Sequence, residues 1–348
     1  MCVYFSSSFA VTIGIDKALK SEAKYLITLE FAKSVPSRLD PRTESLITSV
    51  EADSILQGIQ SIQTDISREI SLSHLRVVVI GEQIAKEKDF KDLSNYLIRE
   101  PKVALRLRLV FVQEGKARDI FYAKHNFQQL LGSEIVDFAQ AQQDLSLTRT
   151  HNFLNFIRDL HRTKGTALGS RVGIKGEEKA IAKDGGAVFK NWKLAAWLDP
   201  KETQAANWLI GETNPIVVAK DGKGTYTYQV SNWDSKIAPV TEDGELRFLV
   251  KINTVGMVME EAGTDLEFSD PINLKKMETL FQETIHNQVI SAVGKSQNEI
   301  IADYLGFGKA FEQYYPEAFK SLDWDEVYPA VPIEIQVSCK VKGYGLRS

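Results

Sequence analysis

The sequence contains little cysteine, no long hydrophobic run and no excess of positive charge. Its 348 residues include only Cys2 and Cys339, which excludes a disulfide framework and a zinc site built from four cysteines. No stretch reaches the roughly 18 consecutive apolar residues that a membrane-spanning helix requires. Lys and Arg number 42 against 46 Asp and Glu, and this net charge of −4 disfavours a nonspecific nucleic-acid binder and cannot hold the chain on an anionic membrane.

Signatures of catalysis and of cofactor binding are also missing. Gly294-Lys295-Ser296 has Val289 where a phosphate-binding loop needs glycine, so it is interpreted as the end of a helix. Gly306-Phe307-Gly308 lacks the third glycine of a dinucleotide fingerprint, and no Gly-x-Ser-x-Gly elbow occurs. No two histidines are three or four residues apart, as metal ligands on one helix face would be. We therefore expect no catalytic residue, metal or cofactor, while paired acids for glycoside hydrolysis stay open.

The first third of the chain alternates strand patterns with helix patterns. Residues 55–66 repeat isoleucine at three- and four-residue steps, which places these side chains on one helix face. Arg106 and Arg108 alternate with leucines and are expected to share one exposed face of a strand. The strand patterns cover residues 9–15, 25–31, 75–80 and 105–111.

The rest of the chain combines helices with antiparallel strands. A long helix is predicted where Met277, Phe281, Ile285 and Val289 recur every four residues. Cys339 continues the apolar positions of a closing strand and is predicted to be a buried thiol. The other helices are expected at residues 116–143, 149–162, 307–314 and 316–322, and the other strands at 187–189, 225–230, 246–252 and 331–341.

These patterns predict an α+β protein of three consecutive domains, each a mixed or antiparallel sheet with packed helices. The expected domains are residues 1–114, 115–212 and 213–348. Trp192, Trp197 and Trp208 fall within 17 residues, and such a cluster is typical of a core or of a seam between domains.

Four segments in order resemble one family, the Ger(x)C proteins, which are the C subunits of nutrient germinant receptors in bacterial endospores. Each segment alone is a weak signal, but together they extend from about residue 9 to 346. In structural terms the four segments predict turns, helix starts and packed tryptophans. The segments are Thr12–Lys17 with its "IGID" turn, Leu75–Glu82, the stretch from Gly186 through Trp197 and Glu202 to Trp208-Leu209, and Ala302–Gly308.

The resemblance implies a non-enzymatic lipoprotein on the outer face of the spore inner membrane. It also implies two membrane-embedded partners, the A and B subunits of the germinant receptor, and no nucleic acid. The family normally begins with a signal peptide and a lipobox whose cysteine precedes Trp-Asp. Here Cys2 precedes Val3-Tyr4 and has no apolar run before it, so it is not assigned as the lipid site. We expect a mature fragment without the lipobox or a misassigned start codon.

Two hypotheses from different classes follow. The first is a receptor subunit with a protein-binding face, for which the candidates are the strand face bearing Arg106 and Arg108 and the loop from Ser34 to Arg42. Solvated surface is the favoured interpretation of both candidates. The alternative is an extracytoplasmic solute-binding protein or a cell-wall-acting hydrolase, which requires a pocket lined by converging acids or aromatic side chains.

Overall fold

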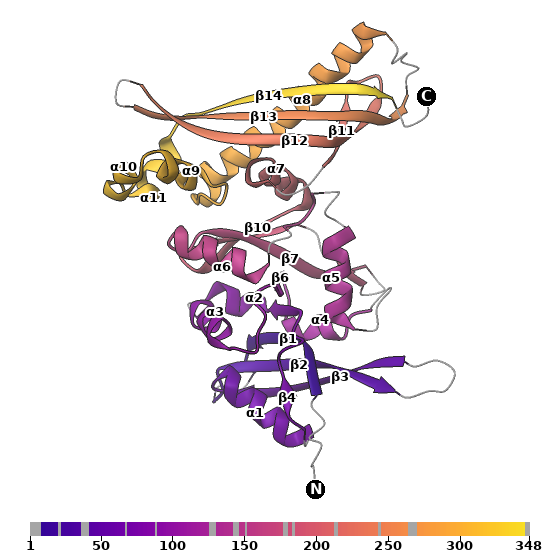
Figure 1. The fold of residues 1–348 in the computed structure, drawn as a ribbon, viewed down its shortest axis with the longest axis vertical. Coiled ribbons are helices and arrows are strands. Elements are labelled where there is room, and N and C mark those ends of the chain that lie inside the picture. The colour runs from indigo at the N-terminus through magenta and orange to yellow at the C-terminus, as the bar shows by residue number, and fades with distance from the viewer. Residues whose placement is uncertain are drawn as a thin grey trace. The chain divides into compact units, whose positions relative to one another are not determined.

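The computed structural model describes residues 8–19, 22–35, 42–66, 68–87, 89–124, 130–141, 146–149, 152–176, 180–182, 185–211, 215–242, 245–263 and 270–344. Contacts between Cα atoms divide the chain into two compact units (Figure 1). Unit 1 comprises Met1–Ala141 and Arg149–Trp197, and unit 2 comprises Gln142–Thr148 and Leu198–Ser348. No helix within these described ranges is both long enough and apolar enough to cross a membrane.

Unit 1 is built on a mixed sheet that has ten strands among the described residues. Eight strands follow the order β10-β9-β7-β6-β5-β1-β2-β3, while β4 pairs with β1 and β8 pairs with β7. The strands are β1 Ser8–Lys17, β2 Tyr25–Val35, β3 Arg42–Ala52, β4 Ile70–Ser71, β5 Val77–Ile80, β6 Arg108–Val112, β7 Ala167–Lys175, β8 Ala180–Ala182, β9 Gly186–Lys190 and β10 Lys193–Leu198. The helices are α1 Ile55–Ile66, α2 Glu82–Lys86, α3 Asp89–Arg99, α4 Ala117–Phe121, α5 Leu131–Ala141 and α6 Phe153–Arg162.

The centre of this sheet is parallel and its two flanks are antiparallel. β1, β5, β6 and β7 run in one direction, with β5 paired to both β1 and β6. β2 and β3 continue from β1 as an antiparallel meander, and β9 returns antiparallel to β7. The carboxyl ends of the parallel strands therefore lie at one edge of the sheet, which is where open α/β sheets commonly place their sites.

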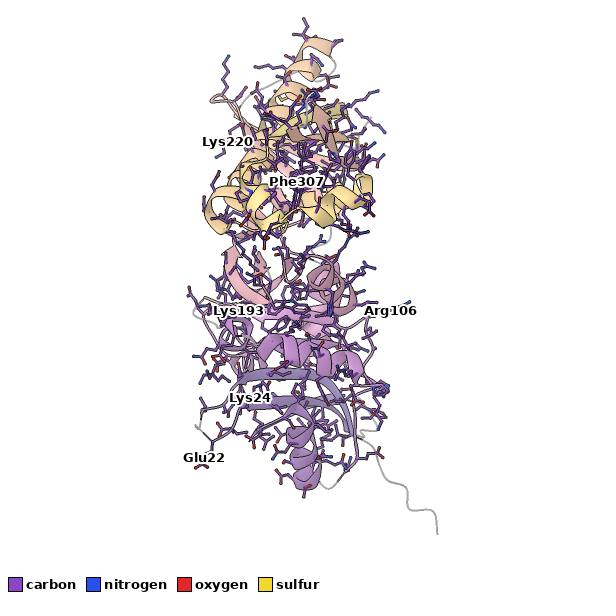
Figure 2. All side chains as sticks on the ribbon, turned by 90° about the vertical axis from the view of Figure 1, so that its left-hand side faces the viewer. Glu22, Lys24, Arg106, Lys193, Lys220 and Phe307 are labelled. Atoms are coloured by element: carbon purple, nitrogen blue, oxygen red, sulfur yellow. The ribbon has the colours of Figure 1, made fainter. Side chains whose placement is uncertain are left out.

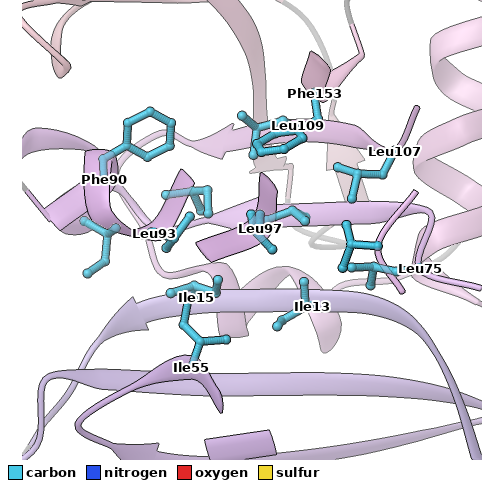
Figure 3. Packing of buried hydrophobic residues seen from close by; sticks show 14 of the residues in the cluster. Ile13, Ile15, Ile55, Leu75, Phe90, Leu93, Leu97, Leu107, Leu109 and Phe153 are labelled. Carbon is cyan, nitrogen blue, oxygen red and sulfur yellow. The ribbon is translucent and has the colours of Figure 1, made fainter. Parts of the chain in front are cut away.

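Side chains on the two faces of the sheet enter two different hydrophobic clusters. Val78 and Ile80 of β5 belong to the larger cluster, which also receives α1, α3 and α6 (Figure 3). Val77 and Val79 belong to the second cluster, with residues of α4 and α5. All four valine and isoleucine side chains of β5 are fully buried, as expected for a strand covered on both faces.

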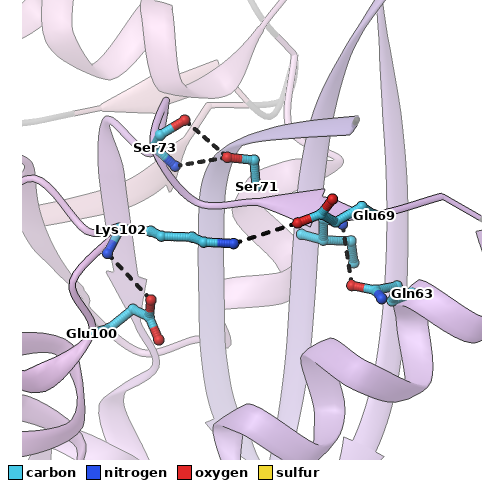
Figure 4. A network of polar contacts seen from close by, with 7 residues as sticks. Gln63, Glu69, Ser71, Ser73, Glu100 and Lys102 are labelled. Carbon is cyan, nitrogen blue, oxygen red and sulfur yellow. Dashed lines mark hydrogen bonds and ion pairs between the residues drawn. The ribbon is translucent and has the colours of Figure 1, made fainter. Parts of the chain in front are cut away.

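A small polar network ties the end of α1 to the strand and turn that follow (Figure 4). The side chain of Gln63 accepts from the backbone N–H of Ile70 at 3.2 Å. Lys102 forms an ion pair with Glu69 at 3.5 Å across exposed surface. Exposed ion pairs contribute roughly 0–1 kcal/mol to the free energy of unfolding. These contacts therefore fix the position of residues 69–73 more than they stabilise unit 1.

Unit 2 contains a four-stranded sheet in the order β11-β12-β13-β14, as far as the described residues show. β11, β12 and β13 are antiparallel, whereas β14 pairs in parallel with β13. The strands are β11 Ile216–Lys220, β12 Thr225–Glu242, β13 Glu245–Ala262 and β14 Ile333–Tyr344. The helices are α7 Pro200–Ile210, α8 Pro271–Gly294, the π-helix Lys295–Ile300, α9 Phe307–Tyr314, α10 Pro316–Ser321, α11 Trp324–Val327 and the 3₁₀ turn Tyr328–Ala330.

The long helix α8 carries the core of unit 2. Met277, Phe281, Ile285 and Val289 are fully buried, which confirms the face that the four-residue spacing predicts. Phe281 stacks on Tyr228 of β12 with ring centroids 4.6 Å apart. The helix therefore lies on the inner face of the sheet through the side chains that the sequence indicates.

The α+β class is confirmed, while several expected boundaries differ from the structure. β6 and β7 pair directly, so β7, whose residues were assigned to a middle domain, joins the first sheet across residue 114. The contacts accordingly group the chain into two units, where the sequence patterns suggested three domains. The expected boundary near residue 212 lies outside the described residues. The helix expected over 116–143 is divided into α4 and α5.

Two further expectations are corrected by local hydrogen bonding. The strand expected from residue 105 begins at Arg108, because the carbonyls of Leu105 and Leu107 accept from the first N–H groups of α6 instead of joining the sheet. The helix expected to end at Gly294 continues as a π-helix, and Gly294 has φ −58°, a right-handed helical value and not the left-handed one of a capping glycine.

Candidate functional site

The Ile-Gly-Ile-Asp turn and the Ile-Gly-Glu turn of unit 1 meet at the carboxyl ends of β1 and β5. Ile15 pairs with Ile80, so Asp16 and Gly81 are the next residues on adjacent parallel strands. A Cβ atom built on Gly81 would lie 2.0 Å from Oδ1 of Asp16, closer than real Cβ atoms approach. The aspartate therefore requires glycine at position 81, and the two segments form one structural element.

Asp16 fixes the beginning of α4. Its Oδ1 accepts from the backbone N–H of Ala117 at 2.7 Å, and its Oδ2 accepts from that of Arg118 at 2.9 Å. Burial raises the pKa of Asp16 to about 6, and these two backbone donors oppose the rise. A carboxylate placed here satisfies N–H groups that the first turn of a helix leaves without partners.

Glu82 holds the segment just before α4. Its Oε2 accepts from the backbone N–H of Glu114 at 2.7 Å, and its Oε1 accepts from the indole Nε1 of Trp197 at 3.1 Å. Lys86 pairs with the same Oε1 at 2.7 Å. Burial alone would raise the pKa of Glu82, but the bonds from Lys86, Trp197 and Glu114 together hold it below its ordinary value.

Residues 113–116, which Glu82 holds through Glu114 and which lead into the start of α4, line a pocket of about 290 Å³. It lies beside the carboxyl ends of β6 and β7 and is also lined by Asp119, Arg171 and Lys175. Glu114 has φ 53°, a left-handed value that non-glycine residues rarely adopt. Among the residues that the structure describes, no group of His, Cys, Asp or Glu side chains could hold a metal ion.

A third buried acid, Glu30 of β2, binds the beginning of α5. Its carboxylate accepts from Thr12 Oγ1 at 2.6 Å and Ser45 Oγ at 2.9 Å. It also accepts from the backbone N–H groups of Leu131 at 2.8 Å and Gly132 at 3.2 Å. No local pattern in the sequence predicts this role for Glu30. The available signal was a glutamate directly between the apolar strand residues Leu29 and Phe31.

In unit 2, the aspartate of the Asp-x-x-Gly-Phe-Gly segment likewise binds the backbone at the start of a helix. Asp303 accepts from the backbone N–H groups of Gly306, Phe307 and Gly308 and from the indole Nε1 of Trp324. A Cβ atom on Gly308 would lie 2.5 Å from Nε1 of Trp324, so glycine is required for this approach. Burial raises the pKa of Asp303, while the four donors lower it.

Several predicted positions serve the interior or lie outside the described part. Cys339 is buried on β14, which confirms a buried strand thiol, and this burial raises the pKa of the thiol to about 11. Arg106 is exposed in a turn before β6, as Figure 2 shows, whereas Arg108 is half-buried on β6, so the two do not form one exposed strand face. Cys2, Pro36 and Arg38 lie outside the described residues.

The three clustered tryptophans make ring contacts or donate hydrogen bonds through the indole nitrogen. Trp192 lies edge-on to His161 with centroids 4.8 Å apart. Trp208 is 1% exposed and donates to Oε1 of Gln288 at 3.0 Å, and Trp197 donates to Glu82. Trp192 and Trp197 belong to unit 1 and Trp208 to unit 2.

The arrangement of the buried acids is suited to stabilisation. Asp16, Glu30 and Asp303 each accept from consecutive backbone N–H groups at a helix start or its entry loop. Charge-assisted bonds of this kind are stronger than neutral ones and fix the direction of the helix. Because backbone donors occupy both oxygens of each carboxylate, these acids are held away from proton transfer.

Comparison with known proteins matches nearly the whole chain in two consecutive segments. Residues 6–172 match the family described as "Spore germination protein N-terminal domain". Residues 184–345 match the family described as "Spore germination B3/ GerAC like, C-terminal". Both segments occur in the order that the four sequence motifs suggest.

Individual relatives extend over the same length. "Spore germination protein KC" of Bacillus subtilis (strain 168) is 24% identical over 97% of this chain and 89% of its own. "Spore germination protein B3" of the same strain is 22% identical over 97% of this chain and 91% of its own. The solved structure "Crystal Structure of the GerBC protein" has the same fold, with TM-score 0.64, 19% identity and coverage of 95% of this chain and 96% of that one. The chain therefore belongs to the Ger(x)C family, the spore germination proteins that resemble germinant receptor C subunits.

Proposed function

We propose that this protein is a non-enzymatic C subunit of a spore germinant receptor. It acts in spore germination from the outer face of the spore inner membrane, where a lipid holds it beside the A and B membrane subunits. The names of its relatives and the family resemblance of its motifs support this role.

One observation carries the non-catalytic part of the proposal. The acids of the family-like motifs, Asp16, Glu82 and Asp303, are bound by backbone N–H groups and indole nitrogens of the same unit. A general acid or base must reach a substrate atom with a free oxygen. These carboxylates instead hold the loops and helix starts on which a binding surface depends.

The proposal is tested with spores of the organism that carries the gene. Spores lacking the gene should fail to germinate on the cognate nutrient, while a trigger that does not act through nutrient receptors should still germinate them. Restoring the gene should restore the nutrient response. Normal nutrient germination of the deletion spores would end the receptor hypothesis.

The lipid anchor is tested separately in the natural gene product. Cells supplied with a labelled fatty acid should transfer the label to this protein, and the protein should sediment with the inner membrane. Loss of the diacylglyceryl transferase should abolish the label and release the protein. If the protein is unlabelled but still supports germination, the lipid anchor is refuted and the receptor role is not affected.

A further inference from the structure

Unit 2 contains a cavity of about 380 Å³ beside α7, α8 and the start of the π-helix. Ala205 of α7 and Ala292 of α8 are buried in its lining, and Ser291 lies next to them. Short side chains on two packed helices leave room that longer ones would fill. At roughly 30 Å³ for each water molecule, the space suits a ligand of about a dozen non-hydrogen atoms.

The backbone at one wall of this cavity is distorted. The α-helix α8 continues as a six-residue π-helix, Lys295–Ile300. This segment ends at Ile301, which has φ 54°. A β-branched residue in the left-handed region is strained, and π-helical segments occur often at functional sites. Ser296 stabilises the turn by donating to the carbonyl of Ala302 at 2.7 Å.

This distortion places two polar side chains in the lining of the cavity. Lys295 is the first residue of the π-helix, and Tyr304 follows the strained turn. Tyr304 is 5% exposed, and burial raises the pKa of its hydroxyl, which therefore stays protonated and can donate. Among the described residues, none accepts a hydrogen bond from this hydroxyl.

Both oxygens of Glu202, the carboxylate of the lining, are occupied, whereas several donors of the lining have no partner among the described residues. Glu202 accepts from Lys295 through Oε1 and from the backbone N–H of Asp199 through Oε2. Oε1 of Gln288 accepts from Trp208, so the amide nitrogen of Gln288 is the part left to donate. No described residue accepts from that nitrogen, and none pairs with Lys201 at the mouth.

We propose that this cavity binds a small organic carboxylate. Two lysines, Lys201 and Lys295, face one glutamate, and the unused donors are the Tyr304 hydroxyl and the Gln288 amide. A carboxylate accepts several such hydrogen bonds and prefers donors that are charged or shielded from water. An uncharged ligand of equal size would not balance the excess of lysine over glutamate charge in this lining. The inference does not depend on the receptor role of the chain.

The test uses the purified chain and two matched pairs of probes. Succinate is compared with succinamide, and gluconate with glucose, by titration calorimetry and ligand-detected NMR. At least one of the two carboxylates should bind with a dissociation constant in the millimolar range or below, and its neutral partner about tenfold more weakly or not at all.

Variants connect the binding to the cavity. Tyr304→Phe and Lys295→Gln should each weaken the carboxylate by roughly fivefold or more, because each removes one donor. Ser291→Leu lies at an exposed position and should abolish binding by filling the space. The matched control, Lys251→Gln, removes an exposed lysine of β13 and should leave the affinity unchanged.

Each outcome decides the proposal. Failure of both carboxylates to bind the folded protein would overturn it, as would equal binding of a carboxylate and its neutral partner. Binding that survives Ser291→Leu, Tyr304→Phe and Lys295→Gln alike would place the ligand elsewhere and also overturn it. Thermal unfolding of every variant confirms that the chain is folded, and Tyr304→Phe keeps the test valid if the leucine variant does not fold.

Discussion

Replacing Gly81 with alanine tests the contact between the two motifs of unit 1 most sharply. Gly81 has φ −67° and ψ 150°, values that alanine adopts without strain, so the backbone itself does not oppose the change. The new methyl group would lie 2.0 Å from Oδ1 of Asp16. The carboxylate must move away and lose its bonds to Ala117 and Arg118.

The expected loss of stability follows from those two bonds. Hydrogen bonds to a charged group contribute about 1.5–3 kcal/mol each, so losing both costs roughly 3–6 kcal/mol. The lower entropy of alanine in the unfolded chain offsets about 0.4–1 kcal/mol of this. We therefore expect Gly81→Ala to destabilise unit 1 by roughly 2–5 kcal/mol.

A double-mutant cycle with Asp16→Ala isolates the steric cause. Once the carboxylate is removed, Gly81→Ala should cost less than about 1 kcal/mol, because the methyl group then has only the backbone nitrogen of Ala117 close by, at 3.3 Å. Hydrogen exchange should show that the amides of Ala117 and Arg118 lose protection in each single variant. Gly173→Ala is the matched control in the same sheet, since a Cβ there has nothing within 4 Å. Equal costs for Gly81→Ala with and without Asp16 would refute the steric argument.

Three further predictions concern other buried groups. Gly308→Ala should lower the melting temperature of unit 2, because the new methyl group meets the indole of Trp324. Gly294→Ala is the control and should leave the melting temperature unchanged, because its nearest neighbour lies 3.9 Å away. Equal shifts of the two variants in calorimetry would contradict this. The pKa of Asp16 is raised from 3.8 to about 6 in the folded chain, so the folded state binds the extra proton. The free energy of unfolding should therefore fall by about 2 kcal/mol as pH rises from 4 to 6, and Asp16→Ala should flatten that slope in urea titrations. The Cys339 thiol, with its pKa raised to about 11, should resist alkylation at pH 8 until the protein is denatured; rapid labelling of the native chain, followed by mass spectrometry, would show that it is accessible.

Regular elements could be predicted from the sequence because their side-chain periods are local. The spacing of Met277, Phe281, Ile285 and Val289 defines the buried face of α8 without reference to any other segment. The closing strand is equally clear, because Val337, Cys339 and Val341 alternate with exposed polar residues. Each pattern predicts one helix or strand and the face of it that is buried.

Partners distant along the chain could not be predicted in the same way. Asp16 and Ala117 are 101 residues apart, as are Glu30 and Leu131, and no local period links an acid to the helix that it caps. The pairing of β6 with β7 is also long-range, and it joins segments that composition assigns to different domains. The π-helix after Gly294 was missed because glycine and lysine at a helix end predict a stop, while the hydrogen bond between Ser296 and the distant Tyr328 hydroxyl favours continuation.

We propose that the acids of the family-like motifs, Asp16, Glu82 and Asp303, have structural roles. Spores that carry Asp303→Asn in place of the natural protein test it directly. The account predicts that the rate of nutrient germination falls in proportion to the amount of subunit retained in the spore, measured by quantitative immunoblot. A variant present at the natural amount that supports no germination would show that the carboxylate itself takes part in function, and would contradict the account.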